Sequence, residues 1–63
     1  MSYTEAITAL LEGKRIRKKN SEQIRCIFIN NGMFEFVYQN GRFSCRSWNL
    51  DISDLMAEWE ILE

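Results

Sequence analysis

Two Asn-Gly steps, each set between apolar runs, limit the folds open to this chain more than any other feature. The motif "NNG" occupies residues 30–32 and "NG" occupies residues 40–41. Asn and Gly tolerate the positive φ angles that a type I′ turn requires, so Asn-Gly between apolar segments is a strong hairpin signal. The two turns therefore predict three consecutive antiparallel strands, at residues 24–30, 33–39 and 42–48.

The segment 2–13, "SYTEAITALLEG", has the pattern of an amphipathic helix. Ser2 and Glu5 have the spacing of a capping box, and Gly13 stands where a left-handed C-cap is needed. Two turns of helix are not stable alone in water, so this helix must lie against a sheet. The apolar stripe expected to face that sheet consists of Tyr3, Ala6, Ile7, Leu10 and Leu11.

Three further elements complete the expected fold. Residues 15–18, "RIRK", form a short strand with Ile16 facing the core, and residues 51–58 form a short helix that Asp51 caps. Residues 58–63 close the chain as a strand with Trp59 and Ile61 on one side. We therefore predict one α+β domain, residues 1–63. It has an N-terminal helix packed on an antiparallel β meander of about four to five strands, with a short helix before the last strand.

A chain of 63 residues has a marginal core, and small domains usually need a disulfide, a metal or self-association. Cys26 and Cys45 are interpreted as small buried hydrophobes in a reducing compartment, and the absence of His argues against a structural zinc site. The middle strands are apolar on both faces: Ile24, Cys26 and Phe28 alternate with Ile27 and Ile29. Since one helix covers one face only, we expect a homo-oligomer, a dimer or a tetramer.

The sequence shows no catalytic motif. It contains no His, no nucleophile elbow and no phosphate-binding glycine loop. The spacing of Asp51 and Asp54 suits helix capping better than acid–base chemistry. We therefore expect no enzyme, no catalytic residue, no metal and no cofactor. No apolar run approaches the roughly 20 residues of a membrane span, and the first residues lack a signal-peptide pattern, so a membrane partner is not expected and the cytoplasm is the expected compartment.

Charge is unevenly distributed along the chain. Residues 14–19 hold five cationic side chains, residues 1–31 carry a net charge of +3, and residues 32–63 carry −4. Either the basic run binds an anion or it is a solvated edge that discourages aberrant strand pairing. In the first interpretation Arg17 contributes to a guanidinium cluster that recognises phosphate. Trp48 could then stack on a base and Asn49 could read its edge, although Trp48 is as readily explained as a core residue.

The two ends of the chain together resemble a family of small, mostly phage-encoded proteins. Its members open like "F-x-E-A-L-x-x-L-x-x-G-K-x-V-x-R" and close like "D-L-L-A-x-D-W-x-I-V". This chain opens with "ALLEGKRIRKK" and closes with "DLMAEWEILE". The family includes the second class of Thoeris anti-defence proteins and a relative reported as an anti-CRISPR. The matched positions are Ala6, Leu10, Gly13, Lys14, Ile16, Lys18, Trp48, Asp54, Leu55, Ala57, Trp59 and Ile61.

The resemblance implies a function. Members of the family form oligomers and sequester cyclic-ADP-ribose-like signals of bacterial immune enzymes in the host cytoplasm without cleaving them. It carries over Lys18, Trp48 and Asp54 as ligand-binding positions, to which the spatial argument above adds Arg17 and Asn49. The chain departs from the family at Ser21, which stands roughly where the family has a Trp. The expected partner is thus a nucleotide-derived small-molecule signal, either cyclic-ADP-ribose-like or a cyclic oligonucleotide.

Two alternatives remain open at this point. The two-faced apolar sheet and the charge asymmetry also suit a small phage protein that inhibits a host enzyme or defence protein by direct protein–protein binding. A weak nucleic-acid binder using residues 14–19 is the other alternative. Nucleic-acid-binding domains are usually basic overall and this chain has a net charge of −1, so nucleic acid is not an expected partner.

Overall fold

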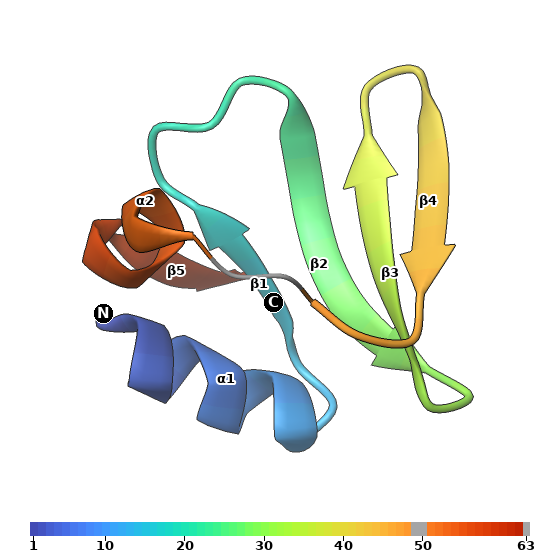
Figure 1. Cartoon of the computed structure of the whole chain (residues 1–63), viewed down its shortest axis with the longest axis horizontal. Helices are drawn as coiled ribbons and strands as arrows, with labels where there is room; N and C mark the ends of the chain where they lie inside the picture. Colours follow the sequence, from blue (N-terminus) through green and yellow to red (C-terminus); the bar gives the residue numbers. More distant parts are fainter. Residues whose placement is uncertain (49–50, 63) are drawn as a thin grey trace.

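The computed structural model describes residues 1–48 and 51–62 (Figure 1). The elements follow the predicted order of helix, four strands, short helix and strand. They are α1 (Tyr3–Leu11), β1 (Arg15–Lys18), β2 (Ile24–Asn30), β3 (Met33–Tyr38), β4 (Gly41–Cys45), α2 (Ile52–Met56) and β5 (Trp59–Leu62). No helix in the described part of the chain is long and apolar enough to cross a membrane.

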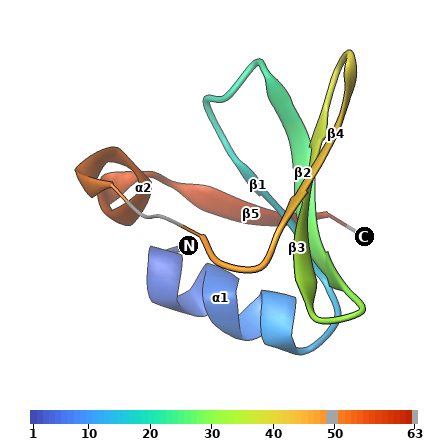
Figure 2. The ribbon, with the colours of Figure 1, turned by 45° about the vertical axis from the view of Figure 1, so that its right-hand side comes forward.

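The five strands form one antiparallel sheet in the order β4-β3-β2-β1-β5. The first four strands are a meander, and β5 returns to pair with β1, so the last strand lies next to the first one. The sheet is strongly twisted: β2, β3 and β4 run at a steep angle to β5, while α1 and α2 lie toward the β1 and β5 end (Figures 1 and 2). This arrangement confirms the predicted α+β fold.

Both ends of α1 form as the sequence predicts. The Ser2 hydroxyl accepts a hydrogen bond from the Glu5 backbone, and the Glu5 carboxylate accepts one from the Ser2 backbone, which is a complete capping box. At the other end Gly13 has φ +89°, and Lys14 donates its backbone N–H to the Ala9 carbonyl as in a Schellman motif. The chain therefore turns sharply from α1 into β1.

The face that α1 buries is rotated from the predicted one. Ala6, Ala9 and Leu10 are buried, whereas the side chain of Leu11, which we expected on the buried stripe, is 75% exposed. Ala6 and Leu10 mark the direction in which the helix faces the core, and at about 100° per residue Leu11 projects about a third of a turn away from it. Its prediction as a core residue was wrong.

The core lies between α1 and the sheet. Ile16 and Ile27 are direct neighbours on β1 and β2 and are almost completely buried, as is Trp59 on β5. These positions confirm the predicted inward orientation of Ile16 and Trp59. The buried cluster consists of Ala6, Ala9, Leu10, Ile16, Ile27, Phe36 and Trp59.

A β-bulge in β2 changes which side chains share a face. Ile24 pairs with Tyr38, but Cys26 pairs with Val37, so the register shifts between Ile24 and Cys26. Since side chains alternate along a strand, the extra residue moves Ile24 to the helix-facing side, where it packs against the core. The prediction that Ile24 shares a face with Cys26 and Phe28 was therefore wrong.

The two hairpins close with different turns. Asn31 and Gly32 have φ angles of +53° and +75°, as a type I′ turn requires, which confirms the first predicted turn. In the second hairpin Tyr38 pairs with Gly41, so the loop is Gln39–Asn40 and Gly41 begins β4. The turn thus lies one residue earlier than predicted.

Strand β4 is shorter than the predicted strand 42–48. It ends at Cys45, and the chain then leaves the sheet so that Trp48 lies against the aromatic side chains between the sheet and α1. Packing one large indole against the core stabilises the fold more than extending β4 would, because an edge strand forms backbone hydrogen bonds on one side only.

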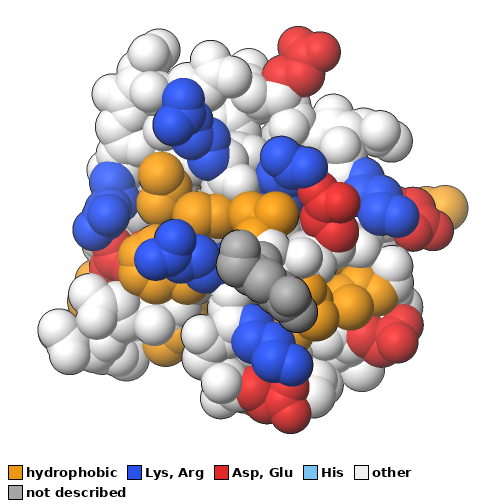
Figure 3. All heavy atoms as spheres, turned by 180° about the vertical axis from the view of Figure 1, so that it is seen from behind, with side chains coloured by type: hydrophobic (Ala, Val, Ile, Leu, Met, Phe, Trp, Pro, Cys, Tyr) orange, Lys and Arg blue, Asp and Glu red, His pale blue; other side chains and the backbone are white. Residues whose placement is uncertain are grey.

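No helix in residues 1–48 and 51–62 covers the face of the sheet away from α1. Phe28 lies there with the guanidinium groups of Arg15 and Arg42 over its ring, 5.3 and 5.7 Å from the centroid. In the view from behind, hydrophobic side chains form a band that Lys and Arg side chains border (Figure 3). The stems of long cationic side chains can cover apolar surface while their charged ends stay in water, so this face is partly shielded without a second layer.

Replacing Ile16 by Ala tests the core. We expect Ile16→Ala to lower the free energy of unfolding by about 2–5 kcal/mol, because the side chain is completely buried and leaves a cavity. Ile52→Ala is the matched control, since the side chain of Ile52 is 73% exposed, and we expect it to change stability by less than about 0.5 kcal/mol. Urea denaturation followed by tryptophan fluorescence measures both. Equal losses in the two variants would contradict this assignment of the core.

The helix caps predict how stability depends on pH. The Ser2 backbone N–H lowers the pKa of Glu5 from its ordinary value of 4.5, and the Ser53 hydroxyl, followed by the Asp54 backbone, lowers the pKa of Asp51 from 3.8. A pKa that is lower in the folded state stabilises the fold above the unfolded pKa, and this contribution is lost as the pH falls through the folded pKa. We therefore expect both caps to weaken as the pH falls below about 4.

The control variant replaces both capping carboxylates by amides, which keep the hydrogen bonds but do not titrate. Gln at position 5 and Asn at position 51 are both good capping residues. We expect the double variant Glu5→Gln, Asp51→Asn to lose less stability between pH 5 and pH 3 than the parent protein in thermal unfolding. An unchanged pH dependence would show that the caps do not contribute to it.

Candidate ligand-binding site

The basic run 14–19 is largely neutralised within the fold. Arg17 forms a salt bridge with Glu60, its direct neighbour on β5. Lys18 pairs with Asp54 at 2.7 Å, and Lys19 lies 3.8 Å from Glu58. The antiparallel pairing of β1 with β5 brings the cationic segment alongside the acidic end of the chain, so most of its charges already have partners.

Lys18, Asp54 and Trp59 form a compact cluster between β1, α2 and β5. The Lys18 ammonium donates a hydrogen bond to the Asp54 carboxylate and lies 5.6 Å from the centre of the Trp59 ring. The Trp59 indole N–H donates to the Asp54 backbone carbonyl at 3.0 Å. Burial, and secondarily the negative charge of Asp54, raises the pKa of the nearby Tyr3. These contacts fix α2 against the sheet, which is a structural role for the cluster.

Trp48 is surrounded by other aromatic rings. Its centroid lies 5.4 Å from that of Phe36, 5.6 Å from Trp59 and 5.7 Å from Tyr3, each in an edge-to-face arrangement. Such pairs add about 0.5–1.5 kcal/mol beyond the burial of their area. The indole is still only half-buried, and its remaining surface borders an open groove.

That groove, which we call the aromatic groove, is a depression lined mostly by apolar side chains of β3, β4 and the segment after β4. It has a volume of about 390 Å³. Helix α1 does not reach this end of the sheet, so Phe43 on β4 is 57% exposed, and its ring lies 6.4 Å from that of Phe36. The groove is lined by Phe36, Tyr38, Phe43, Cys45, Ser47 and Trp48.

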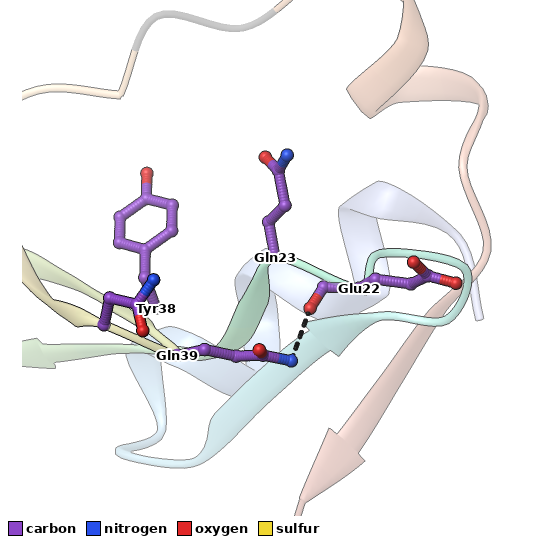
Figure 4. A pocket seen from close by; sticks show the side chains of 5 residues that line it. Glu22, Gln23, Tyr38 and Gln39 are labelled. Atoms are coloured by element: carbon purple, nitrogen blue, oxygen red, sulfur yellow. Dashed lines mark hydrogen bonds between the residues drawn. The ribbon is translucent and has the colours of Figure 1, made fainter.

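A second depression, which we call the polar hollow, adjoins the aromatic groove at Tyr38. It measures about 420 Å³ and lies between the β1–β2 connection and the β3–β4 hairpin. Figure 4 shows Tyr38 and Gln23 side by side, and the Gln39 amide donates a 3.0 Å hydrogen bond to the Glu22 carbonyl. The hollow is lined by Glu22, Gln23, Tyr38, Gln39 and Asn40. Aromatic rings and amide groups thus line two depressions that share Tyr38.

The predicted site residues are only partly brought together. Lys18 and Asp54 are in direct contact, and Trp48 joins them through Trp59. Arg17 lies on the opposite side of the sheet, as its place next to Ile16 in the strand requires, and its charge is paired with Glu60. Asn49 lies outside the described residues.

Sequence reasoning gave little weight to the residues that line most of the groove. Tyr38 and Phe43 were not among the predicted site residues, because their strands looked like ordinary meander strands. The available signal was the length of the helix: nine residues span about 13 Å, while five strands span nearly 20 Å. One end of the sheet must therefore remain uncovered, and Phe43 is at that end.

Comparison with family models, with curated proteins and with solved structures finds no match to this chain. The family resemblance of the two ends therefore remains a prediction, resting on the matched residues. Three of them, Lys18, Asp54 and Trp59, are in contact with one another. These contacts give the three residues a structural role, through packing and charge pairing, that requires no ligand.

A double-mutant cycle tests the cluster. We expect Lys18→Met and Asp54→Asn to show a coupling free energy of about 1–2 kcal/mol, because the pair is short and both side chains are less than one-third exposed. The more exposed pair of Lys14 and Glu12 is the matched control, and we expect a coupling below about 0.5 kcal/mol for it. Urea denaturation of the parent protein and of the single and double variants of each pair, seven proteins in all, gives both values. Equal coupling in the two pairs would contradict the structural role of the cluster.

Proposed function

We propose that this protein is a non-enzymatic, phage-type anti-defence protein that captures a nucleotide-derived immune signal and keeps it from its receptor. The aromatic groove is the observation that carries the proposal. Phe43 and Tyr38 offer ring faces on which a base can stack, and stacking of a base on an aromatic side chain contributes about 1–3 kcal/mol. The amide groups of the adjoining polar hollow supply donors and acceptors for the polar edge of the ligand.

A cationic side chain next to the groove can bind the phosphate groups of a nucleotide. Arg46 lies in the chain between Cys45 and Ser47, which both line the groove, and its side chain is exposed. Among the described residues no carboxylate lies within 4.0 Å of it. A guanidinium group binds phosphate in a planar, bidentate geometry. Arg46 is thus better placed for an anionic ligand than Arg17 or Lys18, whose charges are paired.

Capture requires no chemistry. A protein that binds a signal and is present in excess lowers the free concentration of that signal, and the receptor stays inactive. The resemblance of the chain ends to the anti-defence family supports this role, and so do the uncovered aromatic side chains. Sequestration in the cytoplasm of an infected cell is the proposed setting.

The second candidate function is inhibition of a host protein by direct contact, and one observation favours it. Helix α2 contacts the sheet through Asp54, but its apolar side chains point to solvent: Ile52 is 73%, Leu55 54% and Met56 81% exposed. Apolar side chains grouped on one short helix are typical of a protein-docking surface. This surface is separate from the residues that line the aromatic groove.

A capture experiment tests the proposed function. The purified protein is incubated with lysate of cells that express an immune cyclase, washed and heated, and the released small molecules are identified by mass spectrometry. We expect an intact nucleotide in stoichiometric amount. Phe43→Ala should reduce the affinity for it roughly 5- to 150-fold, which corresponds to the loss of one stacking contact.

The matched control is Phe28→Ala, on the opposite face of the sheet. We expect this variant to retain the nucleotide as well as the parent protein does. Release of a cleaved product, or equal retention by the Phe43→Ala variant, contradicts the proposal. If the protein retains no nucleotide but inhibits the host defence, and the Leu55→Asp variant no longer inhibits it, the protein acts through α2 instead.

A further inference from the structure

Strand β4 forms an open edge of the sheet. At the other edge, the backbone of Trp59 in β5 exchanges hydrogen bonds with Met1 in both directions, each at 3.0 Å. Beyond β4 no strand lies in the part of the chain that the structure describes. Gly41, Arg42, Phe43 and Ser44 are all exposed. The free N–H and C=O groups of such an edge form a template for a further strand.

We propose that β4 pairs antiparallel with β4 of a second copy of this chain, centred on Phe43, and that each copy adds its Phe43 to the aromatic groove of the other. The contribution to the groove rests on the proposed function, whereas the strand pairing does not. Pairing about a central residue gives the same contacts in both directions, as a two-fold symmetric interface requires.

The direction of the backbone groups limits the possible registers. The two-residue loop Gln39–Asn40 closes on the hydrogen-bonded pair Tyr38–Gly41. Because hydrogen-bonded pairs alternate along an antiparallel ladder, the N–H and C=O groups of Arg42 and Ser44 point toward the open edge. An antiparallel second β4 can therefore pair in three registers. They place Arg42 opposite Arg42, Arg42 opposite Ser44, or Ser44 opposite Ser44.

Charge selects one of the three registers that remain. Pairing Arg42 with its own copy opposes two arginines, and pairing Ser44 with its own copy places Arg42 opposite Arg46. Like charges directly opposite each other destabilise a strand pair. Only the register that pairs Arg42 with Ser44 avoids both, and Phe43 is at its centre.

The same register supplies a cation to a buried carboxylate. Glu35 is 7% exposed and accepts a 2.7 Å hydrogen bond from the Ser44 hydroxyl. No cationic group among the described residues lies within 4.0 Å of it. Glu35 and Ser44 are direct neighbours across β3 and β4, so Arg42 of a second copy would lie next in the same row, within reach of Glu35. Buried carboxylates are rarely left without a charged partner.

On the opposite face, the pairing covers the exposed aromatic side chain. The two Phe43 residues form a non-hydrogen-bonded pair, in which the Cα atoms are about 4.5 Å apart and the side chains are closest. Each ring already borders Phe36 of its own chain. The seam thus covers one side of each Phe43 ring and extends the apolar wall of both grooves, in which the other side stays open to a ligand.

Cysteine cross-linking tests the register. In a Cys45→Ser background, Phe43→Cys places two thiols at the distance that a disulfide spans, and Thr8→Cys places a thiol at an exposed position of α1. We expect oxidation to link the Phe43→Cys variant into dimers at least tenfold faster than the Thr8→Cys variant. Equal rates overturn the proposed pairing.

Light scattering on the ligand-free protein tests the charge argument. We expect a mass of two chains or a multiple of it for the parent protein at about 100 μM. Arg42→Glu should raise the dissociation constant at least tenfold with an unchanged circular dichroism spectrum, and Arg25→Glu, the matched control, should leave it unchanged. A folded single chain in the parent protein, or equal effects of the two variants, overturns the inference.

The two proposals fail separately. A parent protein that is dimeric and cross-links through residue 43, but retains no nucleotide, supports the strand pairing and refutes the proposed function. A single chain that retains the nucleotide refutes the pairing and leaves the capture function standing.

Discussion

The pairing of β1 with β5 is the contact on which the rest of the structure depends. It joins segments more than forty residues apart in sequence, and it places Ile16 beside Ile61, Arg17 beside Glu60 and Lys18 beside Trp59. One short ladder therefore contributes to the core, to the neutralisation of the basic run and to the anchoring of the last strand. Without it, neither Trp59 nor the cationic side chains of β1 would have their present partners.

This pairing also explains why the most conspicuous feature of the sequence is not its clearest binding feature. A run of five cationic residues suggests an anion site when the chain is considered locally. In the fold, acidic residues of α2, of β5 and of the short connection between them lie against that run. Three of its side chains form salt bridges with Asp54, Glu58 and Glu60. The separation of charge into a basic and an acidic half thus contributes to the folding of the single chain.

The fold could be predicted because local signals agreed with one another. The capping box at Ser2, the left-handed Gly13 and the Asn31–Gly32 turn each specify a conformation within a few residues. The incorrect predictions concern places where tertiary packing determines the backbone conformation. The bulge before Cys26 has no local marker, and Trp48 leaves the strand because its indole finds aromatic partners elsewhere.

For the site, sequence reasoning identified Trp48 but could not identify the groove beside it. A groove depends on what remains uncovered, and this follows from the length and direction of α1 and not from any motif. The same reasoning missed Glu35, which looks like an outward-facing residue in an alternating strand and is nevertheless buried next to Ser44. Burial of an acidic side chain on a sheet face is visible only when its neighbours across the strands are known.

The aromatic groove and the open edge have a common physical origin. A nine-residue helix can cover about three strands of a five-stranded sheet, and α1 packs against β1, β2 and β5. The two strands left over carry aromatic side chains on the helix side and an unpaired ladder at the edge. Both require a partner, because exposed rings and exposed backbone groups are costly to leave without contacts. A small molecule can satisfy the rings but not the ladder, whereas a second strand satisfies the ladder and brings another ring to the groove.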